Sequence, residues 1–436
     1  MNRGLFRTGA LYLLSFLLGA WCAGNATAGE RTVRLEYRVF PGLHQMDGNW
    51  AALTAASDGK VYAGLAYHGG DGHLVYYDAK TDQMHDVGNL TELCGESHLK
   101  RGPQSKIHAK FGEGKDGRIY YGTHGGSWWN YARFGTQEGY PGAHWMAYDP
   151  KSNRVEDFGI GPVNEGINTG SYDPKFNRLY GMTHPRGHFV YYDVATRKHV
   201  DKGRVNNWES ICRTLAIDDE GIVYGGFGLG RLFKYDPRTD EILELSLRVP
   251  IREKGISLGR DYNKSETSFR TMVWDGVTRQ FFGIDESATL LFSFNPRIGP
   301  EGEVKRLGQL AIPALAESRE VPYATLSLTL GQDRKLYYGA AGREFDYGGS
   351  AEPALAHLLT YDLASGKIVD LGGMMLPDGL RVFGTNAADT GPDGTIYMIG
   401  AIEVKPAGNQ PPEAGGKIGK CWFRLALLIY KPGQTP

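Results

Sequence analysis

The heptapeptide Asp-Gly-Arg-Ile-Tyr-Tyr-Gly, residues 116–122, contains the pattern that decides the fold of this chain. Its Asp-Gly pair is typical of a tight turn, because glycine adopts positive φ angles without a steric cost. The residues after the turn are aliphatic and aromatic, as expected of a short strand that packs against a neighbouring sheet. A second apolar stretch follows and ends in Tyr148-Asp149. The segment therefore predicts antiparallel strands that begin at a tight turn.

The same pattern occurs seven times along the chain. Each copy has a turn, a strand ending near glycine, a variable loop, a strand ending in Tyr-Asp or an equivalent, and a short outer strand. The paired segments are 58–64 with 77–78, 116–122 with 148–149, 177–181 with 192–193, 220–225 with 235–236, 279–283 with 294–295, 335–339 with 361–362, and 393–397 with 430–431. Four short strands are the unit of a β-propeller blade. We predict an all-β, seven-bladed β-propeller of four-stranded antiparallel blades.

The Tyr-Asp segments predict the turn into each outermost strand. In residues 192–196 and 361–365 the aspartate is followed by Thr or Ser three positions later. Such an aspartate caps its own turn by accepting backbone hydrogen bonds. These aspartates are therefore predicted to be structural and are excluded as catalytic candidates.

A strand from the N-terminal region is expected to close the ring. At 436 residues the chain exceeds the usual size of one core, so a single domain requires a repetitive architecture. Residues 29–436 divide into seven blades of about 58 residues. The seventh copy has no room for a fourth strand after Tyr430, whereas residues 31–39 alternate like a strand without a hairpin partner. We expect residues 31–39 to complete blade seven. Two β-sandwiches, the alternative all-β arrangement, would need a linker that the sequence lacks.

The first 28 residues resemble a secretory signal peptide. Arg3 and Arg7 precede an apolar run from Leu11 to Ala23, and residues 26–28 read Ala-Thr-Ala, a typical cleavage site. The run is too short to span a bilayer comfortably. Cys22 raises the alternative of a lipid anchor, which the bulky Trp21 disfavours. We expect a secreted or periplasmic protein with no membrane span.

Composition excludes a general nucleic-acid binder. The 48 Lys and Arg residues balance 49 Asp and Glu residues, which leaves a net charge of -1. After cleavage Cys94, Cys212 and Cys421 would remain, without CxxC spacing. We expect buried free thiols, with their pairing left open.

Candidate functional residues gather at one predicted rim of the propeller. This rim consists of the loops joining second to third strands and the loops entering each innermost strand. The repeat brings to it His68, His124, His144, His184, His188, Arg204, Arg213, Arg270, Asp285, Glu286 and Arg343. Lys106 and His108 lie at the start of the second innermost strand and share a strand face with Lys110. Histidines concentrate in blades two and three.

Aromatic residues lie between two of these histidines. Residues 127–134 include Trp128 and Trp129. Aromatic faces beside polar groups are typical of a sugar-binding cleft, although the same residues could pack over the rim. Trp128 is therefore a candidate for substrate binding.

Several reaction types lack their residue patterns. His184 and His188 are four residues apart, but they flank Arg186 in a Pro/Gly turn, and no HExxH motif accompanies them. There is no GxSxG elbow. Asp285 and Glu286 are sequence neighbours, which point to opposite faces of a strand and cannot act as a paired-carboxylate glycosidase site. No catalytic metal or cofactor is expected; a structural ion is left open.

Bases and cations together suit β-elimination from a uronic acid. Removing the proton next to a carboxylate requires a cation that neutralises the carboxylate, and arginine matches its geometry. A histidine or tyrosine can then take the proton, and another can donate one to the leaving oxygen. Arg204 or Arg213 with His124, His144 and His188 would supply these roles.

The arrangement resembles the ulvan lyases and related propeller polysaccharide lyases. His124 and His144 resemble the family's rim pair in blade two, and Arg204 its carboxylate-neutralising arginine. The family's tyrosine falls near His188 here. The resemblance implies His124, His144, His188 and Arg204 as catalytic residues, and which one is the base stays open.

The sequence thus predicts an exported polysaccharide lyase that acts on an acidic, ulvan-like polysaccharide and is a monomer. Sulfated polymers are included, because Lys106, Lys110, Arg186 and Arg270 add local positive charge. The candidate substrate-binding residues are Lys106, His108, Trp128, His184, Arg213 and Arg270. Two alternatives remain: a non-catalytic periplasmic scaffold that binds a ligand or protein, and a metal-dependent lyase or hydrolase.

Overall fold

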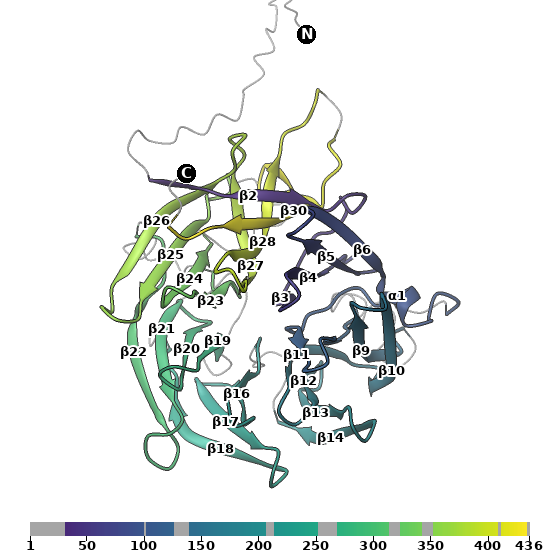
Figure 1. The fold of residues 1–436 in the computed structure, drawn as a ribbon, viewed down its shortest axis with the longest axis vertical. Helices are drawn as coiled ribbons and strands as arrows, with labels where there is room; N and C mark the ends of the chain where they lie inside the picture. Colours follow the sequence, from purple (N-terminus) through teal and green to yellow (C-terminus); the bar gives the residue numbers. More distant parts are fainter. Residues whose placement is uncertain are drawn as a thin grey trace, which may run out of the picture.

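The strands form seven sheets in a ring around a central axis (Figure 1). The structure, a computed structural model, describes residues 31–99, 102–125, 139–205, 213–251, 268–313, 323–341, 352–408 and 411–433. Within these ranges the predicted all-β, seven-bladed propeller is confirmed. The predicted signal peptide, Trp128, Cys212 and Arg343 lie outside the described residues.

Blades one to four each pair four consecutive strands in antiparallel order. Blade one has β3 (Leu53–Ala55), β4 (Lys60–Leu65), β5 (His73–Asp78) and β6 (Gln83–Asn89), followed by the short helix α1 (Leu90–Leu93). Blade two has β7 (Gly112–Glu113), β8 (Ile119–Gly122), β9 (Gly142–Asp149) and β10 (Arg154–Val163). Blade three has β11 (Gly166–Asp173), β12 (Arg178–His184), β13 (His188–Asp193) and β14 (Lys198–Arg204). Blade four has β15 (Ala216–Ile217), β16 (Val223–Phe227), β17 (Arg231–Asp236) and β18 (Glu241–Arg248).

Blades five to seven continue the order, and the last two take in strands from the N-terminal region. Blade five has β19 (Phe269–Asp275), β20 (Gln280–Asp285), β21 (Leu290–Asn295) and β22 (Glu303–Gln309). Blade six has β23 (Leu328–Leu330), β24 (Lys335–Ala340), β25 (His357–Asp362) and β26 (Ile368–Met375), with β1 (Thr32–Arg34) at its edge. Blade seven has β27 (Val382–Thr390), β28 (Ile396–Val404), β30 (Cys421–Tyr430) and β2 (Glu36–Val39), with β29 (Gly416–Ile418) paired to β30.

The N-terminal strand closes the ring as predicted. Strand β2 pairs with β30 in antiparallel register, from Glu36 opposite Ile429 to Val39 opposite Ala426, and supplies the fourth strand of blade seven (Figure 1). The expected single strand is divided at Leu35, because residues 32–34 pair in parallel with β26 of blade six instead. The Leu35 side chain is buried, and its N–H donates to the Met375 carbonyl at 3.0 Å. One segment therefore joins two blades.

The aspartates of the repeat hold turns, as predicted. Asp193 accepts hydrogen bonds from the backbone and the hydroxyl of Thr196, and Asp362 from the backbone of Ala364 and Ser365. At the same end of the blade, in the turn between the first and second strands, Asp116 accepts from the backbone of Arg118. Their oxygens are thus used within the fold.

Glycines at the ends of second strands allow neighbouring blades to approach closely. A Cβ atom on Gly122 would lie 2.7 Å from the Ile167 side chain of the next blade, and one on Gly64 would lie 2.7 Å from Ile107. A Cβ atom on Gly339 would likewise meet the Thr385 side chain of the next blade, so this contact explains the glycines of blades one, two and six. Between the blades, large side chains such as Trp145, Tyr180 and Phe233 are fully buried, each stabilising the fold by about 1.5–3 kcal/mol. Over the described ranges, no helix is long and apolar enough to cross a membrane.

Candidate functional site

One histidine position recurs in the blades as a structural pair. The third strand begins with a histidine in blades one, three and six, namely His73, His188 and His357. In blade two, His144 lies two residues after the start of the third strand. Each imidazole Nδ1 lies 2.9–3.0 Å from an aspartate 13 residues later, namely Asp86, Asp157, Asp201 and Asp370. Arg231 and Glu244 form the corresponding pair in blade four, at 2.7 Å. The pair fastens the third strand to the fourth, and the spacing of His and Asp was the sequence signal for it.

His144 has a second carboxylate partner. Its Nε2 lies 3.0 Å from Glu96, and both side chains are almost fully buried. Burial opposes the charged imidazole, but hydrogen bonds to Asp157, Cys94 and Glu96 outweigh it and raise the pKa of His144 to about 11. His144 therefore keeps its proton at neutral pH and cannot serve there as a base.

A buried polar network surrounds His144. The Gln104 amide donates to Glu96 and to the Gly142 carbonyl, each at 2.9 Å. Its oxygen accepts from the hydroxyls of Thr123 at 2.8 Å and Tyr140 at 2.7 Å. The network joins the segment entering blade two to the end of its second strand, and so holds the residues next to Lys106 and His124.

Five rings from blades one to three form a continuous row, which we name the ring row. It runs through His68, Trp50, His108, His124 and His184, with ring centres 5.1, 5.4, 5.7 and 5.5 Å apart in that order. Lys106 pairs through its backbone with His124, and its ammonium lies over the Trp50 ring, 4.6 Å from the centre. His108, His124 and His184 are all at least nine-tenths buried. The row follows the rim predicted from the repeat.

The buried histidines of the ring row are neutral bases beside cations. Burial, followed by the charge of Lys106, lowers the pKa of His108 and His124 well below the usual range and that of His184 to about 3. Arg213 acts on all three in the same direction. Burial also lowers the pKa of Lys106 to about 8, with Asp47 opposing the shift. Among the described residues, no acidic side chain forms an ion pair with Lys106. The site therefore favours an anion and disfavours a metal cation.

Two buried polar atoms at equivalent positions of the repeat have no hydrogen-bond partner within the described residues. In blades one, two and three, the residues that pair with the end of the second strand are Gly48, Lys106 and Gly166. Two residues after them lie Trp50, His108 and Asn168, respectively. The two atoms are His108 Nδ1 and Asn168 Nδ2. Buried polar groups are normally hydrogen-bonded, so these two atoms are candidates for contact with a ligand.

Blade five contributes a further cation to this charged region. Arg270 is buried, lies 3.0 Å from Glu286 and donates to the Tyr323 hydroxyl at 2.8 Å. Its charge also acts on His108. Asp285 bonds instead to the backbone of Ser287 and Leu290, and burial raises its pKa to about 6. Glu286 thus pairs with Arg270, whereas Asp285 holds a turn, so the two neighbouring carboxylates do not act together, as expected.

The structure places the predicted site residues in two groups. It brings together Lys106, His108, His124 and His184, with the charge of Arg213 acting on all four and that of Arg270 on His108. His144 and His188 lie in the repeated His–Asp pairs instead. Arg204 is exposed at the end of the outermost strand of blade three, opposite His188. Trp128 lies outside the described residues. Sequence reasoning missed Trp50 and Asp47; aligning blade one with blade two would have placed Trp50 at the position of His108.

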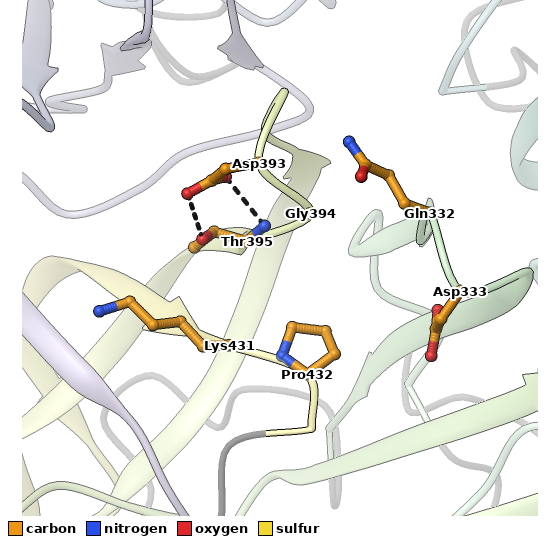
Figure 2. A pocket seen from close by; sticks show the side chains of 7 residues that line it. All are labelled: Gln332, Asp333, Asp393, Gly394, Thr395, Lys431 and Pro432. Carbon is orange, nitrogen blue, oxygen red and sulfur yellow. Dashed lines mark hydrogen bonds between the residues drawn. The ribbon is translucent and has the colours of Figure 1, made fainter.

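A cavity elsewhere offers no comparable group. It has a volume of about 350 Å³. Figure 2 shows the residues that line it, namely Gln332, Asp333, Asp393, Gly394, Thr395, Lys431 and Pro432. The first five lie at the turns between the first and second strands of blades six and seven, and Lys431 and Pro432 follow the end of β30. This is the opposite end of the blades from the ring row. Asp333 accepts from the Tyr337 hydroxyl, Asp393 from Thr395, and Lys431 pairs with Glu36. Its charged groups therefore already have structural partners.

Replacing His144 by asparagine is expected to destabilise the protein more than the same change at His357. Loss of the imidazolium at His144 leaves two carboxylates without their partner and should lower the free energy of unfolding by about 3 kcal/mol. Loss of His357 leaves only one carboxylate without its partner and should lower it by about 1 kcal/mol. The pKa of His144 is higher in the folded protein than in the unfolded chain, where it is about 6.5. The contribution of His144 to the free energy of unfolding is therefore complete below pH 6.5 and declines as the pH rises toward about 11. Chemical denaturation at several pH values measures both effects. Equal losses in the two variants would contradict the dual pairing.

Known structures share the propeller fold at low sequence identity. No family model matches the sequence, and no curated protein is similar to it. A fungal alcohol oxidase of the AA5 family, in complex with copper, is 12% identical with a TM-score of 0.55, covering 89% of this chain and 75% of that one. The RRP9 WD40 repeats are 10% identical with a TM-score of 0.52 (90% and 97% covered). The β-propeller domain of Myceliophteria thermophila Cps50 (Swd1) is 11% identical, also with a TM-score of 0.52 (90% and 99% covered). At such identities the likeness establishes the fold alone, a seven-bladed β-propeller.

Proposed function

We propose that this protein is an exported lyase that cleaves an acidic, uronate-containing polysaccharide by β-elimination at the ring row. The observation that carries the proposal is the packing of buried, neutral imidazoles beside the cations Lys106 and Arg213. This pairing of base and positive charge is what elimination from a uronate requires.

The cations would bind the substrate carboxylate. A carbanion next to an ionised carboxylate is strongly disfavoured unless positive charge offsets both. Arg213 can bind a carboxylate through two N–H groups, and Lys106 adds a second charge. Lys106 forms no ion pair with an acidic side chain of the described residues, and its ammonium lies over the Trp50 ring, so its charge can act on an anionic ligand.

The neutral imidazoles would move the proton. Either His124 or His184 takes the proton from the carbon next to the carboxylate. A double bond forms between this carbon and the neighbouring carbon that carries the leaving oxygen, while the bond from that neighbouring carbon to the oxygen breaks. The resulting imidazolium returns its proton to the leaving oxygen. His144 already holds its proton between two carboxylates, so we assign His124 and His184 to the transfer and treat His144 as structural.

Incubation with a panel of acidic polysaccharides tests the proposal. Cleavage by elimination creates an unsaturated uronate, which absorbs in the ultraviolet, whereas hydrolysis does not. We expect this absorbance to increase with at least one uronate-containing polymer and to persist in a chelator. Tight binding of a polymer or protein without any such product would instead favour the scaffold function.

The pH profile should identify the charged groups. The lowered pKa values of His124 and His184 keep these rings unprotonated, so kcat/KM should stay high below pH 6.5, where an ordinary histidine becomes protonated. Loss of charge on Lys106 should lower kcat/KM above a pH of about 8. Since arginine stays charged, Lys106→Arg should shift this alkaline decline to higher pH. An alkaline decline that Lys106→Arg leaves in place would show that another group causes it.

A further inference from the structure

Asn168 and His108 occupy equivalent positions in neighbouring blades. The same position in blade one holds Trp50, whose ring stacks on that of His108 with 5.4 Å between the centres. His108 and Asn168 each follow an isoleucine, Ile107 or Ile167, and a Cβ atom on the glycine of the preceding blade's second strand would lie 2.7 Å from that isoleucine. Because this contact is the same at both blade boundaries, the segments that carry His108 and Asn168 are neighbours beside the central axis.

Each of these two residues carries a buried nitrogen that can donate a hydrogen bond. His108 is 4% exposed and Asn168 is 3% exposed. Neither His108 Nδ1 nor Asn168 Nδ2 has a hydrogen-bond partner within the described ranges. An amide nitrogen only donates, and a neutral imidazole can donate through Nδ1. Since buried polar groups are normally hydrogen-bonded, a ligand that fits both nitrogens must offer hydrogen-bond acceptors.

Three cations from blades two, four and five act on the His108 ring. Burial lowers the pKa of His108 most, and the charges of Lys106, Arg213 and Arg270 add to this effect. Arg270 already has a carboxylate partner, whereas neither Lys106 nor Arg213 forms an ion pair with an acidic side chain of the residues that the structure describes. Asp47 offsets the charge of Lys106 in part. Positive charge therefore exceeds negative charge around the two nitrogens, which favours an anion.

These donors suit a small tetrahedral oxyanion. Phosphate and sulfate carry four oxygens, each of which accepts hydrogen bonds from amide, imidazole, ammonium or guanidinium N–H groups. Here such groups come from blades two, three and four, so they approach the axis from different sides, as four oxygens require. The positive charge that favours such an ion disfavours a metal cation at the same place.

We propose that the protein binds one free oxyanion, phosphate or sulfate, beside the central axis, held by His108, Asn168, Lys106 and Arg213. The ion needs no polysaccharide, so this inference goes beyond the proposed lyase and stands without it. The ion should stabilise the folded protein, because only the folded chain brings these groups together. It should also compete with a substrate carboxylate, which the proposed reaction places on the same cations.

Calorimetric titration of the full-length protein with sodium phosphate and with sodium sulfate tests the site. Sodium chloride holds the ionic strength constant, so that general screening does not change. We expect one ion per chain with a Kd of about 1 mM or lower. Asn168→Leu, which removes the amide donor at similar volume, should raise the Kd about tenfold.

Asn386→Leu is the matched control. Asn386 lies at a register shift of β27 in blade seven, as Asn168 does in β11 of blade three. Its side-chain atom without a hydrogen-bond partner in the described residues is Oδ1, an acceptor, which does not attract an anion. The control variant should bind either ion with a Kd within about twofold of the unchanged protein.

The outcomes separate this site from the lyase. A lack of saturable binding of both ions overturns the site even if a polysaccharide is cleaved. Binding that Asn168→Leu does not weaken places the ion elsewhere and also overturns the site. Binding that depends on Asn168 supports the site even if no polysaccharide is cleaved; if one is cleaved, phosphate should raise KM without lowering kcat. If Asn168→Leu does not fold, Arg213→Gln replaces it, and an undiminished affinity of that variant overturns the site.

Discussion

Replacing His124 or Arg213 by alanine is expected to abolish most elimination activity. His124 lies at the centre of the buried part of the ring row, between His108 and His184, and loss of a proton-transferring group lowers kcat/KM about a thousandfold. In the proposed reaction Arg213 offsets the charge of the substrate carboxylate, so its loss should lower kcat/KM about a hundredfold or more. Formation of unsaturated uronate measures both effects, and thermal unfolding verifies that each variant folds.

The matched controls are Arg204 and His188, to which the sequence analysis assigned the same roles of neutralising the carboxylate and transferring the proton. Arg204→Ala removes an exposed arginine on an outermost strand, and His188→Ala removes a histidine paired with Asp201. Both variants should retain activity within about threefold, because neither residue belongs to the ring row. Loss of activity in these variants, with Arg213→Ala active, would return the catalytic roles to Arg204 and His188.

Deleting residues 31–39 is expected to unfold the protein or to lower its stability by about 5 kcal/mol or more. The segment buries Val33 and Leu35, adds an edge strand to blade six and supplies the fourth strand of blade seven. Its removal exposes the edge of β30, an apolar strand that can then pair with other chains. Since whole domains are stable by about 5–15 kcal/mol, this loss is comparable with the total.

A milder substitution separates loss of closure from loss of folding. Leu35→Ala, at the junction of the two strands, should cost about 3 kcal/mol in chemical denaturation. Val277→Ala, a change to a side chain that is 76% exposed, should alter stability by about 0.5 kcal/mol or less. A truncated protein with an unchanged unfolding midpoint would show that the ring does not need this segment.

The fold could be predicted because its signals are local and repeated. A turn aspartate such as Asp116 or Asp193 accepts hydrogen bonds from residues two to four positions away, so the pattern of each blade is visible in a short window. The need for a closing strand followed from the missing fourth strand of blade seven. The division of that strand at Leu35 was not predictable, because it depends on the edge of blade six, more than 300 residues away.

The site was only partly predictable for the same reason. The repeat placed Lys106, His108, His124 and His184 at one rim, and there the structure packs them together. It could not separate them from His144 and His188, which have the same side chain at nearby positions. The difference lies in their partners: carboxylates fasten His144 and His188, whereas burial and cations keep the other rings neutral.

The sequence by itself determined the number of blades, their turns and the closing strand, since these depend on backbone conformation and on apolar patterns within each repeat. Only the tertiary structure decided which histidines are paired with carboxylates and which are buried beside cations. Protonation depends on the charges and the solvent around each ring, and those come from strands and loops far apart in the chain.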